Sequence, residues 1–376
     1  MLTMKKIIIL GSAHPYRGGL ASYNERLAQE YIKQGNEVEI YTFTLQYPSF
    51  LFPGKTQFSE EPAPKKLKIY RKINAVNPLN WLKIGKEIRK KQPDLVIIKF
   101  WLPFMAPCFG TIARQIRKNG KTRIISILDN VIPHEKRIGD MPMIRYFVNS
   151  VNGFVAMSKS VLNDVNHFNT TKPKIFSPHP LYDNFGEKIV REEAIEQLHL
   201  DKNQQYMLSF GFIRDYKGLD LLMEAFADER FRALNVKLIV AGEFYTNEAF
   251  YFNLEEKLGL KGNIIWANQF IPDSAVRYYF CASDIVVQPY KSATQSGVTQ
   301  IAYHFEKPML VTNVGGLAEI VPNGKVGYVV QPEIKEIADA LLDFFINKKS
   351  STFAENLKIE KEKYSWSKMT DAISKL

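Results

Sequence analysis

The chain has 376 residues, 45% hydrophobic residues, two cysteines and a formal net charge of +11. This length exceeds one typical domain and predicts two domains of roughly 150 to 200 residues, while so few cysteines exclude a disulfide-rich secreted scaffold. No apolar run approaches the roughly 20 residues that span a bilayer, so we expect a cytoplasmic protein, free or peripheral on the inner face of the cell membrane.

The positive charge is confined to the first half of the chain. Residues 1–180 hold 28 Lys and Arg against 12 Asp and Glu, whereas the remaining residues hold 22 against 27. Such a basic face favours an anionic membrane or a phosphorylated acceptor molecule, and a merely solvated surface is the alternative. Because neither zinc-ligand spacing nor a recognised nucleic-acid motif accompanies the charge, we expect no nucleic-acid partner.

In the first half, apolar runs alternate with amphipathic runs, which predicts parallel strands separated by helices. Gly18 and Gly19 stand between the first strand and the first helix. They lack side chains and let a ligand approach the backbone closely, and a plain tight turn is the alternative. The expected strands cover residues 6–11, 37–43, 67–73, 94–102, 122–128 and 153–158, and the expected helices cover residues 20–33, 78–91, 104–118, 143–151 and 158–168.

Two prolines within three residues, Pro178 and Pro180, predict a connector after the first half. We place the domain boundary after residue 182, which gives a first domain over 1–182. The alternation then restarts and predicts a second doubly wound α/β domain over 183–364. Its expected strands cover residues 205–212, 236–242, 263–266, 284–289 and 308–313, and the expected helices cover residues 218–227, 247–258, 274–281, 297–305, 333–347 and 354–376.

Two loops of the second domain carry candidate binding residues. The first includes Arg214 and Lys217, whose fixed positive charges suit a phosphate on which negative charge develops. The second, residues 292–297, places small and hydroxyl side chains before a helix N-terminus, where unpaired N–H groups favour an anion. Solvated cations and ordinary helix capping are the alternatives for each loop taken alone.

The C-terminal domain resembles a known family through Lys307, Pro308, Val314, Gly315, Gly316 and Glu319. These residues are similar to the signature of the retaining glycosyltransferases of family four, which transfer a sugar from a nucleotide-sugar donor. The family fold, GT-B, has two doubly wound Rossmann-like domains facing a central cleft. The chain departs from the pattern because Ala293 and Ile301 replace two glutamates and Phe212 replaces an arginine.

The resemblance implies a donor site on the second domain, closed by the first glycine loop. We expect a UDP- or GDP-linked sugar as substrate, without a cofactor. We also expect no metal, because Arg214 and Lys217 can stabilise the leaving diphosphate. The implied donor-binding residues are Gly18, Gly19, Gly211, Arg214, Lys217, Thr294, Gln295, Ser296, Gly297, Val298, Gly315, Gly316 and Glu319.

Asp129 and His134 are the candidate residues on the acceptor side. Many members of the family have a histidine at the position of Asp129, and His134 follows five residues later. Either side chain can accept a proton from an attacking hydroxyl or orient a sugar, and a helix cap is the alternative for Asp129. With Arg214 and Lys217 they complete the expected catalytic set.

The resemblance implies a metal-independent, hexosyltransferase-like retaining enzyme. It would transfer a sugar to a saccharide or lipid-diphosphate-linked acceptor in bacterial surface polysaccharide synthesis. It also implies that the last helix, from about residue 365 to 376, packs back on the first domain. Two alternatives stay open: a sugar-nucleotide epimerase, which needs no acceptor, and a non-catalytic scaffold that partners an active transferase, which the missing glutamates favour.

Overall fold

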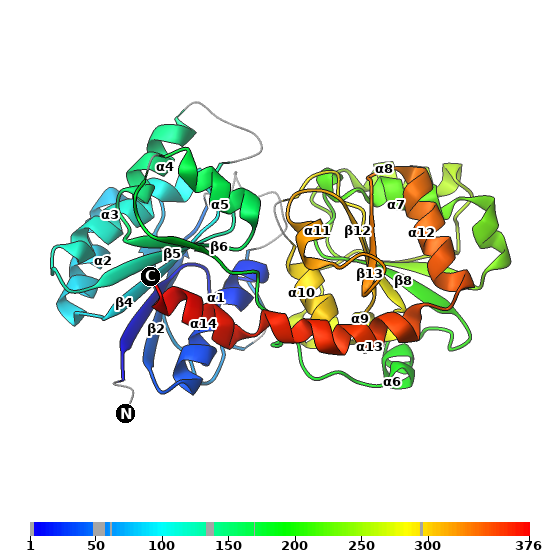
Figure 1. The fold of residues 1–376 in the computed structure, drawn as a ribbon, viewed down its shortest axis with the longest axis horizontal. Helices are drawn as coiled ribbons and strands as arrows, with labels where there is room; N and C mark the ends of the chain where they lie inside the picture. The colour runs from blue at the N-terminus through cyan, green and yellow to red at the C-terminus, as the bar shows by residue number, and fades with distance from the viewer. Residues whose placement is uncertain (1–3, 48–56, 61, 133–138, 169, 294–295) are drawn as a thin grey trace. The chain divides into compact units, whose positions relative to one another are not determined.

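The computed structural model describes residues 4–47, 57–60, 62–132, 139–168, 170–293 and 296–376. The chain divides into two compact units, which we call unit 1 (residues 1–180 with 366–376) and unit 2 (residues 181–365). Each unit has one sheet flanked by helices (Figure 1). The division lies close to the boundary that we expected after residue 182.

Unit 1 is built on a sheet of seven parallel strands. Its elements are β1 (Lys6–Leu10), α1 (Gly19–Lys33), β2 (Glu37–Leu45), β3 (Lys68–Asn74), α2 (Pro78–Lys91), β4 (Leu95–Phe100), the 3-10 helix η2 (Pro103–Met105), α3 (Ala106–Arg117), β5 (Arg123–Leu128), α4 (Asp140–Val148), β6 (Gly153–Ala156), α5 (Lys159–Asn166), β7 (Lys174–Phe176) and α14 (Trp366–Ser374). The strand order is β3-β2-β1-β4-β5-β6-β7. The order therefore reverses direction between β1 and β4, where open α/β sheets bind ligands.

The central strands of unit 1 are apolar runs buried on both faces. Residues 7–10 of β1 are fully buried, and so are most residues of β4 and β5. Continuous runs of this kind are typical of parallel strands that helices cover on both sides. Lys99 is the exception in β4, because it is the only charged residue of that strand and is almost completely buried.

Unit 2 repeats the architecture with six parallel strands. Its elements are α6 (Arg191–Gln197), β8 (Gln205–Phe210), the 3-10 helix η3 (Asp215–Lys217), α7 (Leu219–Phe226), the 3-10 helix η4 (Glu229–Ala233), β9 (Val236–Ala241), α8 (Glu248–Lys257), β10 (Ile264–Ala267), α9 (Asp273–Ala282), β11 (Ile285–Gln288), α10 (Gly297–His304), β12 (Met309–Thr312), α11 (Leu317–Ile320), β13 (Gly327–Val330), α12 (Ile334–Ile346), α13 (Ser350–Glu360) and the 3-10 helix η5 (Lys361–Tyr364). The strand order is β10-β9-β8-β11-β12-β13. Here the reversal lies between β8 and β11.

The prediction of one helix over residues 354–376 was wrong. The chain forms α13, η5 and α14 in turn, and Ser365 has an extended backbone with φ −70° and ψ 148°. The two helices bury their apolar faces in different units, since Phe353 of α13 joins the core of unit 2 and Trp366 of α14 is buried in unit 1. Neither proline nor glycine occurs in residues 354–376, so the break lacks the usual sequence signal.

Helix α14 packs on α1 within unit 1 (Figure 1). The Trp366 ring centroid lies 5.0 Å from that of Tyr23, and the Arg26 guanidinium carbon lies 5.2 Å from the Trp366 ring centroid. The Gln34 side chain adds a hydrogen bond of 2.8 Å to Thr370 Oγ1. Trp366 is thus one of several side chains, with Met369 and Ile373, that α14 buries in unit 1.

We predict that Trp366→Ala lowers the free energy of unfolding of unit 1 by about 3 to 5 kcal/mol, because removing a buried aromatic side chain leaves a cavity. Urea unfolding followed by circular dichroism measures the change. Lys375→Ala, a change at the exposed residue before Leu376, is the control. Equal midpoints for these two variants would contradict the prediction.

Candidate functional site

The loops that follow β8 and β11 contact each other at the carboxyl edge of the unit 2 sheet. The Lys291 N–H donates a hydrogen bond of 2.7 Å to the Tyr216 carbonyl, which ties one loop to the other. Gly218 has φ +66°, and a Cβ added there would lie 2.0 Å from the Pro289 carbonyl oxygen. Only glycine fits this contact, so the loop from β8 packs closely on the end of β11.

The Lys217 ammonium lies at the carboxyl end of β8, beside the first turn of α10. A Cβ added to Gly211, which has φ +92°, would lie 3.1 Å from Lys217 Nζ and 3.7 Å from Val298 Cγ2. The Lys217 ammonium also lies 5.6 Å from the ring centroid of the buried Tyr290. Three of the expected donor-binding residues, Gly211, Lys217 and Val298, therefore meet at the strand-order reversal.

Lys217 and Arg214 are neighbouring cations that lack a carboxylate partner among the described residues. Among the described residues, the ion pairs include neither of them, and Arg214 instead lies over the Tyr245 ring at 5.0 Å. Burial, and then repulsion from Arg214, lower the pKa of Lys217 to about 8. An anion bound here would relieve this repulsion, so the edge is suited to a phosphate group.

Ser296 caps α10 at the same edge. Its hydroxyl oxygen accepts a hydrogen bond of 3.2 Å from the Val298 N–H and lies 3.3 Å from the Tyr290 hydroxyl. A Cβ added to Gly297 would lie 2.6 Å from Cε2 of Tyr182, so this ring packs on the start of the helix. The Val298 N–H is thus already hydrogen-bonded in this structure. Thr294 and Gln295 lie outside the described residues.

The remaining expected residues of unit 2 lie one strand further along the sheet. Gly315, with φ +52°, and Gly316 follow β12, and Glu319 is an exposed residue of α11. The hydrogen bonds and ion pairs of the described residues do not join Glu319 to Arg214 or Lys217. The structure therefore groups Gly211, Arg214, Lys217 and the start of α10.

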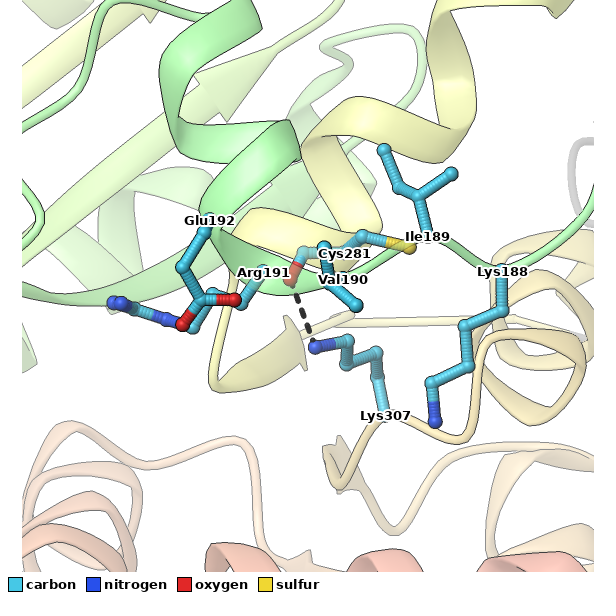
Figure 2. A pocket seen from close by; sticks show the side chains of 7 residues that line it. All are labelled: Lys188, Ile189, Val190, Arg191, Glu192, Cys281 and Lys307. Atoms are coloured by element: carbon cyan, nitrogen blue, oxygen red, sulfur yellow. Dashed lines mark hydrogen bonds between the residues drawn. The ribbon is translucent and has the colours of Figure 1, made fainter.

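A pocket of about 430 Å³ lies at the amino-terminal edge of the same sheet. Figure 2 shows the Lys307 side chain directed at the Cys281 carbonyl, to which it donates at 3.0 Å, and it also donates to the Ser283 carbonyl at 2.8 Å. Lys188 pairs with Glu306 at 2.5 Å. Both lysines are thus occupied by protein groups. Lys307, part of the family signature, ties the start of β12 to the α9–β11 turn.

In unit 1, Asp129 follows β5 directly at the carboxyl edge of the sheet. Its Oδ1 accepts a hydrogen bond of 2.8 Å from Lys99 Nζ, and its N–H donates to the Phe100 carbonyl. Gly18 has φ +94° and precedes α1, of which Gly19 is the first residue. His134 lies outside the described residues.

Sequence analysis missed two buried polar side chains near the expected site. Lys99 was hidden inside the apolar run of β4. Gln300 is fully buried in α10, and neither its amide oxygen nor its amide nitrogen has a hydrogen-bond partner among the described residues. It stands next to Ile301, where the family pattern has a glutamate, and that neighbouring position is the signal that could have identified it.

Within the described ranges, no group of three or more His, Cys, Asp or Glu side chains could hold a metal ion. In the same part of the chain, every helix is too short or too polar to cross a membrane.

Comparison with known proteins places both halves in one family. Residues 17–177 match the model described as Glycosyltransferase Family 4, and residues 190–363 match the model described as Glycosyl transferases group 1. The chain is 24% identical over 386 residues to an uncharacterised glycosyltransferase of Methanocaldococcus jannaschii, covering 100% of this chain and 98% of that protein.

Two more comparisons are informative. The lipopolysaccharide 1,2-N-acetylglucosaminetransferase of Salmonella typhimurium is 29% identical over 184 residues, which cover 46% of this chain and 47% of that protein. Anabaena HepE, crystallised with UDP, superposes with a TM-score of 0.74 at 16% identity, covering 99% of this chain and 100% of that one. The chain belongs to the group 1 glycosyltransferases of family four and consists of the two parallel-sheet, Rossmann-like domains of their GT-B fold.

Proposed function

We propose that this glycosyltransferase uses a nucleotide-diphosphate sugar whose diphosphate binds in unit 2 at Arg214 and Lys217. The observation that carries the proposal is the presence of two cations, without carboxylate partners among the described residues, at the strand-order reversal. That Anabaena HepE was crystallised with UDP is consistent with a UDP-linked donor, and a GDP-linked donor is the other expectation.

The proposed chemistry follows from where charge develops. As the bond between the sugar and the diphosphate breaks, negative charge grows on the departing phosphate. Fixed cations in a partly buried site stabilise that charge without reorganising. In the proposed retaining reaction, the acceptor hydroxyl attacks from the face that the diphosphate leaves. The two cations would supply the electrostatic stabilisation that a metal ion supplies in other enzymes.

The proposed acceptor is a saccharide or a lipid-diphosphate-linked saccharide of a bacterial surface polymer. The Salmonella relative is named as a lipopolysaccharide transferase, which supports this class of acceptor. Unit 1 also carries a basic helix suited to an anionic membrane. Lys83, Lys86 and Lys90 of α2 are exposed, and Leu79 at its start is 77% exposed. An apolar tip beside exposed cations is the pattern of an interfacial helix.

The donor proposal is tested by measuring the thermal midpoint of unfolding with a panel of nucleotides, which we call the nucleotide panel. We expect UDP or GDP, or its sugar conjugate, to raise the thermal midpoint equally with and without Mg²⁺, and we expect CMP, which has no diphosphate, to leave it unchanged. A ligand at 100 times its dissociation constant stabilises the fold by about 2.7 kcal/mol, which is a shift of degrees. The shift should be lost in Lys217→Ala. A wild-type protein that responds to none of these ligands would contradict the proposal.

Lys217→Ala should lower kcat by a factor of roughly 100 or more, the scale of removing one contact to developing charge. Lys257→Ala, an exposed lysine of α8, is the matched control and should keep the wild-type rate. Nucleoside diphosphate release measures both. A Lys217→Ala variant with a near wild-type rate would remove this residue from the mechanism.

The pH dependence of kcat/KM gives an independent prediction for Lys217. The protonated ammonium is the active form, and its pKa is lowered to about 8, so kcat/KM should fall as pH rises through about 8. In Lys217→Arg this decline should disappear below pH 10, because a guanidinium keeps its proton there. The same decline in both proteins would assign it to another group.

Liposome sedimentation tests the membrane proposal. Vesicles containing anionic lipid should bind the wild-type protein better than neutral vesicles, and added salt should weaken the binding. Reversing the three exposed lysines of α2 to glutamate should abolish the preference, whereas Lys257→Glu in unit 2 should keep it. Equal binding to neutral and anionic vesicles at low salt would overturn the proposal.

A further inference from the structure

Unit 1 contains a buried cation that the donor chemistry does not use. Lys99 stands in β4 between Ile98 and Phe100, and its side chain is only 2% exposed. Burial lowers the pKa of Lys99, and the neighbouring Asp129 opposes that shift. A charge in this position is destabilising unless it is paired and hydrogen-bonded.

The ammonium is held between a carboxylate and an aromatic face. Lys99 Nζ lies 2.8 Å from Asp129 Oδ1 on one side and 3.5 Å from the Tyr23 ring centroid on the other. Tyr23 is fixed in turn by rings: its centroid lies 5.0 Å from that of Trp366 and 5.1 Å from that of His179. Lys99 therefore has one defined position beneath Asp129.

The nearby His179 ring carries no charge. Burial and the nearby charge of Lys99 lower the pKa of His179 to about 3, so its ring is neutral at physiological pH. Its Nδ1 lies 2.7 Å from the Pro180 carbonyl oxygen. In the part of the chain that the structure describes, Lys99 is the cation that forms an ion pair with Asp129.

The two side chains of the Lys99–Asp129 ion pair differ in their exposure to solvent. The Asp129 side chain is 14% exposed at the carboxyl end of β5, whereas the ammonium lies below it. The neighbouring strands β1 and β4 mark the strand-order reversal of unit 1, so Asp129 stands at the edge where such sheets bind ligands. The buried partner thus fixes a carboxylate that a ligand can reach.

Stability alone does not account for a lysine here. Replacing a buried ion pair by apolar side chains of similar size is often neutral or stabilising, and the other residues of β4 are apolar. A positional role explains the charge better, because a hydrogen bond to a charged group fixes the direction in which the carboxylate points.

We propose that Lys99 is a positioning residue that orients the Asp129 carboxylate to accept a hydrogen bond from a hydroxyl of the sugar substrate. This inference rests on the proposed function, because it requires that a sugar substrate is bound and turned over. Asp129 makes the contact, and Lys99 acts through it. The Tyr23 ring, backed by Trp366, keeps the ammonium in place.

The experiment is a double-mutant cycle with Lys99→Met and Asp129→Asn, assayed by nucleoside diphosphate release from the donor that the nucleotide panel identifies. Each single change should lower kcat/KM by roughly 10- to 100-fold, the scale of a hydrogen bond to a charged group. Because Lys99 acts through Asp129, the double variant should be no worse than Asp129→Asn. Lys121→Met is the matched control, since Lys121 pairs with Asp94 at the opposite end of β4.

Thermal midpoints separate positioning from a structural role. Asp129→Asn leaves the buried ammonium without its counter-charge and should lower the midpoint, and adding Lys99→Met should restore it. Activity should stay low in that restored double variant. Recovery of activity together with the midpoint would show a purely structural role and overturn the inference.

Other outcomes are equally decisive. Wild-type kcat/KM in Lys99→Met, or losses that multiply in the double variant, would overturn the inference while leaving the proposed function intact. The nucleotide-induced midpoint shift should persist in Lys99→Met, because the diphosphate binds in unit 2. A wild-type protein that releases no nucleoside diphosphate would overturn the proposed function itself, and with it the role of Lys99.

Discussion

The parallel order of the two sheets is the constraint on which the rest of the structure depends. All strands of a parallel sheet end at the same edge, so the loops that follow them meet there, and a reversal of strand order separates two neighbouring loops. In unit 2 the reversal lies between β8 and β11, and Gly218 lets the two loops touch. The residues around Lys217 are thus gathered by topology, although they lie far apart in the sequence.

Each unit holds a lysine that is shielded from solvent to a different degree and in different electrostatic surroundings. Lys217 has no carboxylate partner among the described ion pairs, and burial with repulsion from Arg214 lowers its pKa to about 8. Lys99 is more deeply buried but has Asp129 as its partner at 2.8 Å. A bound anion stabilises the charged form of a cation that has no partner. A cation that already has a carboxylate partner instead fixes the orientation of that carboxylate. Lysine is therefore suited to bind a phosphate in unit 2, and in unit 1 to orient the Asp129 carboxylate toward a hydroxyl.

Most strands could be predicted because buried parallel strands are continuous apolar runs, as residues 7–10 and 285–287 illustrate. The break at Ser365 could not, because residues 354–376 contain neither proline nor glycine. Only the packing shows it, since α13 joins the core of unit 2 and α14 belongs to unit 1. Arg214 and Lys217 were found through a motif. Lys99 was missed because five apolar neighbours defined its strand. That the Val298 N–H is already bonded to Ser296 depends on side-chain placement, which no spacing reveals.

Two of the departures from the expected family pattern lie close to a cation. Phe212 stands where the family has an arginine, and its ring packs against Tyr245 with centroids 4.4 Å apart. The same Tyr245 ring lies 5.0 Å from the Arg214 guanidinium, so the cation displaced by two residues is held at the edge of the same strand. In unit 1, Asp129 replaces a histidine, and the buried Lys99 supplies the positive charge beside it. Arg214 lies within the motif itself and could be found from the sequence, whereas Lys99 lies on the neighbouring strand β4, so the position of Asp129 gives no sign of it.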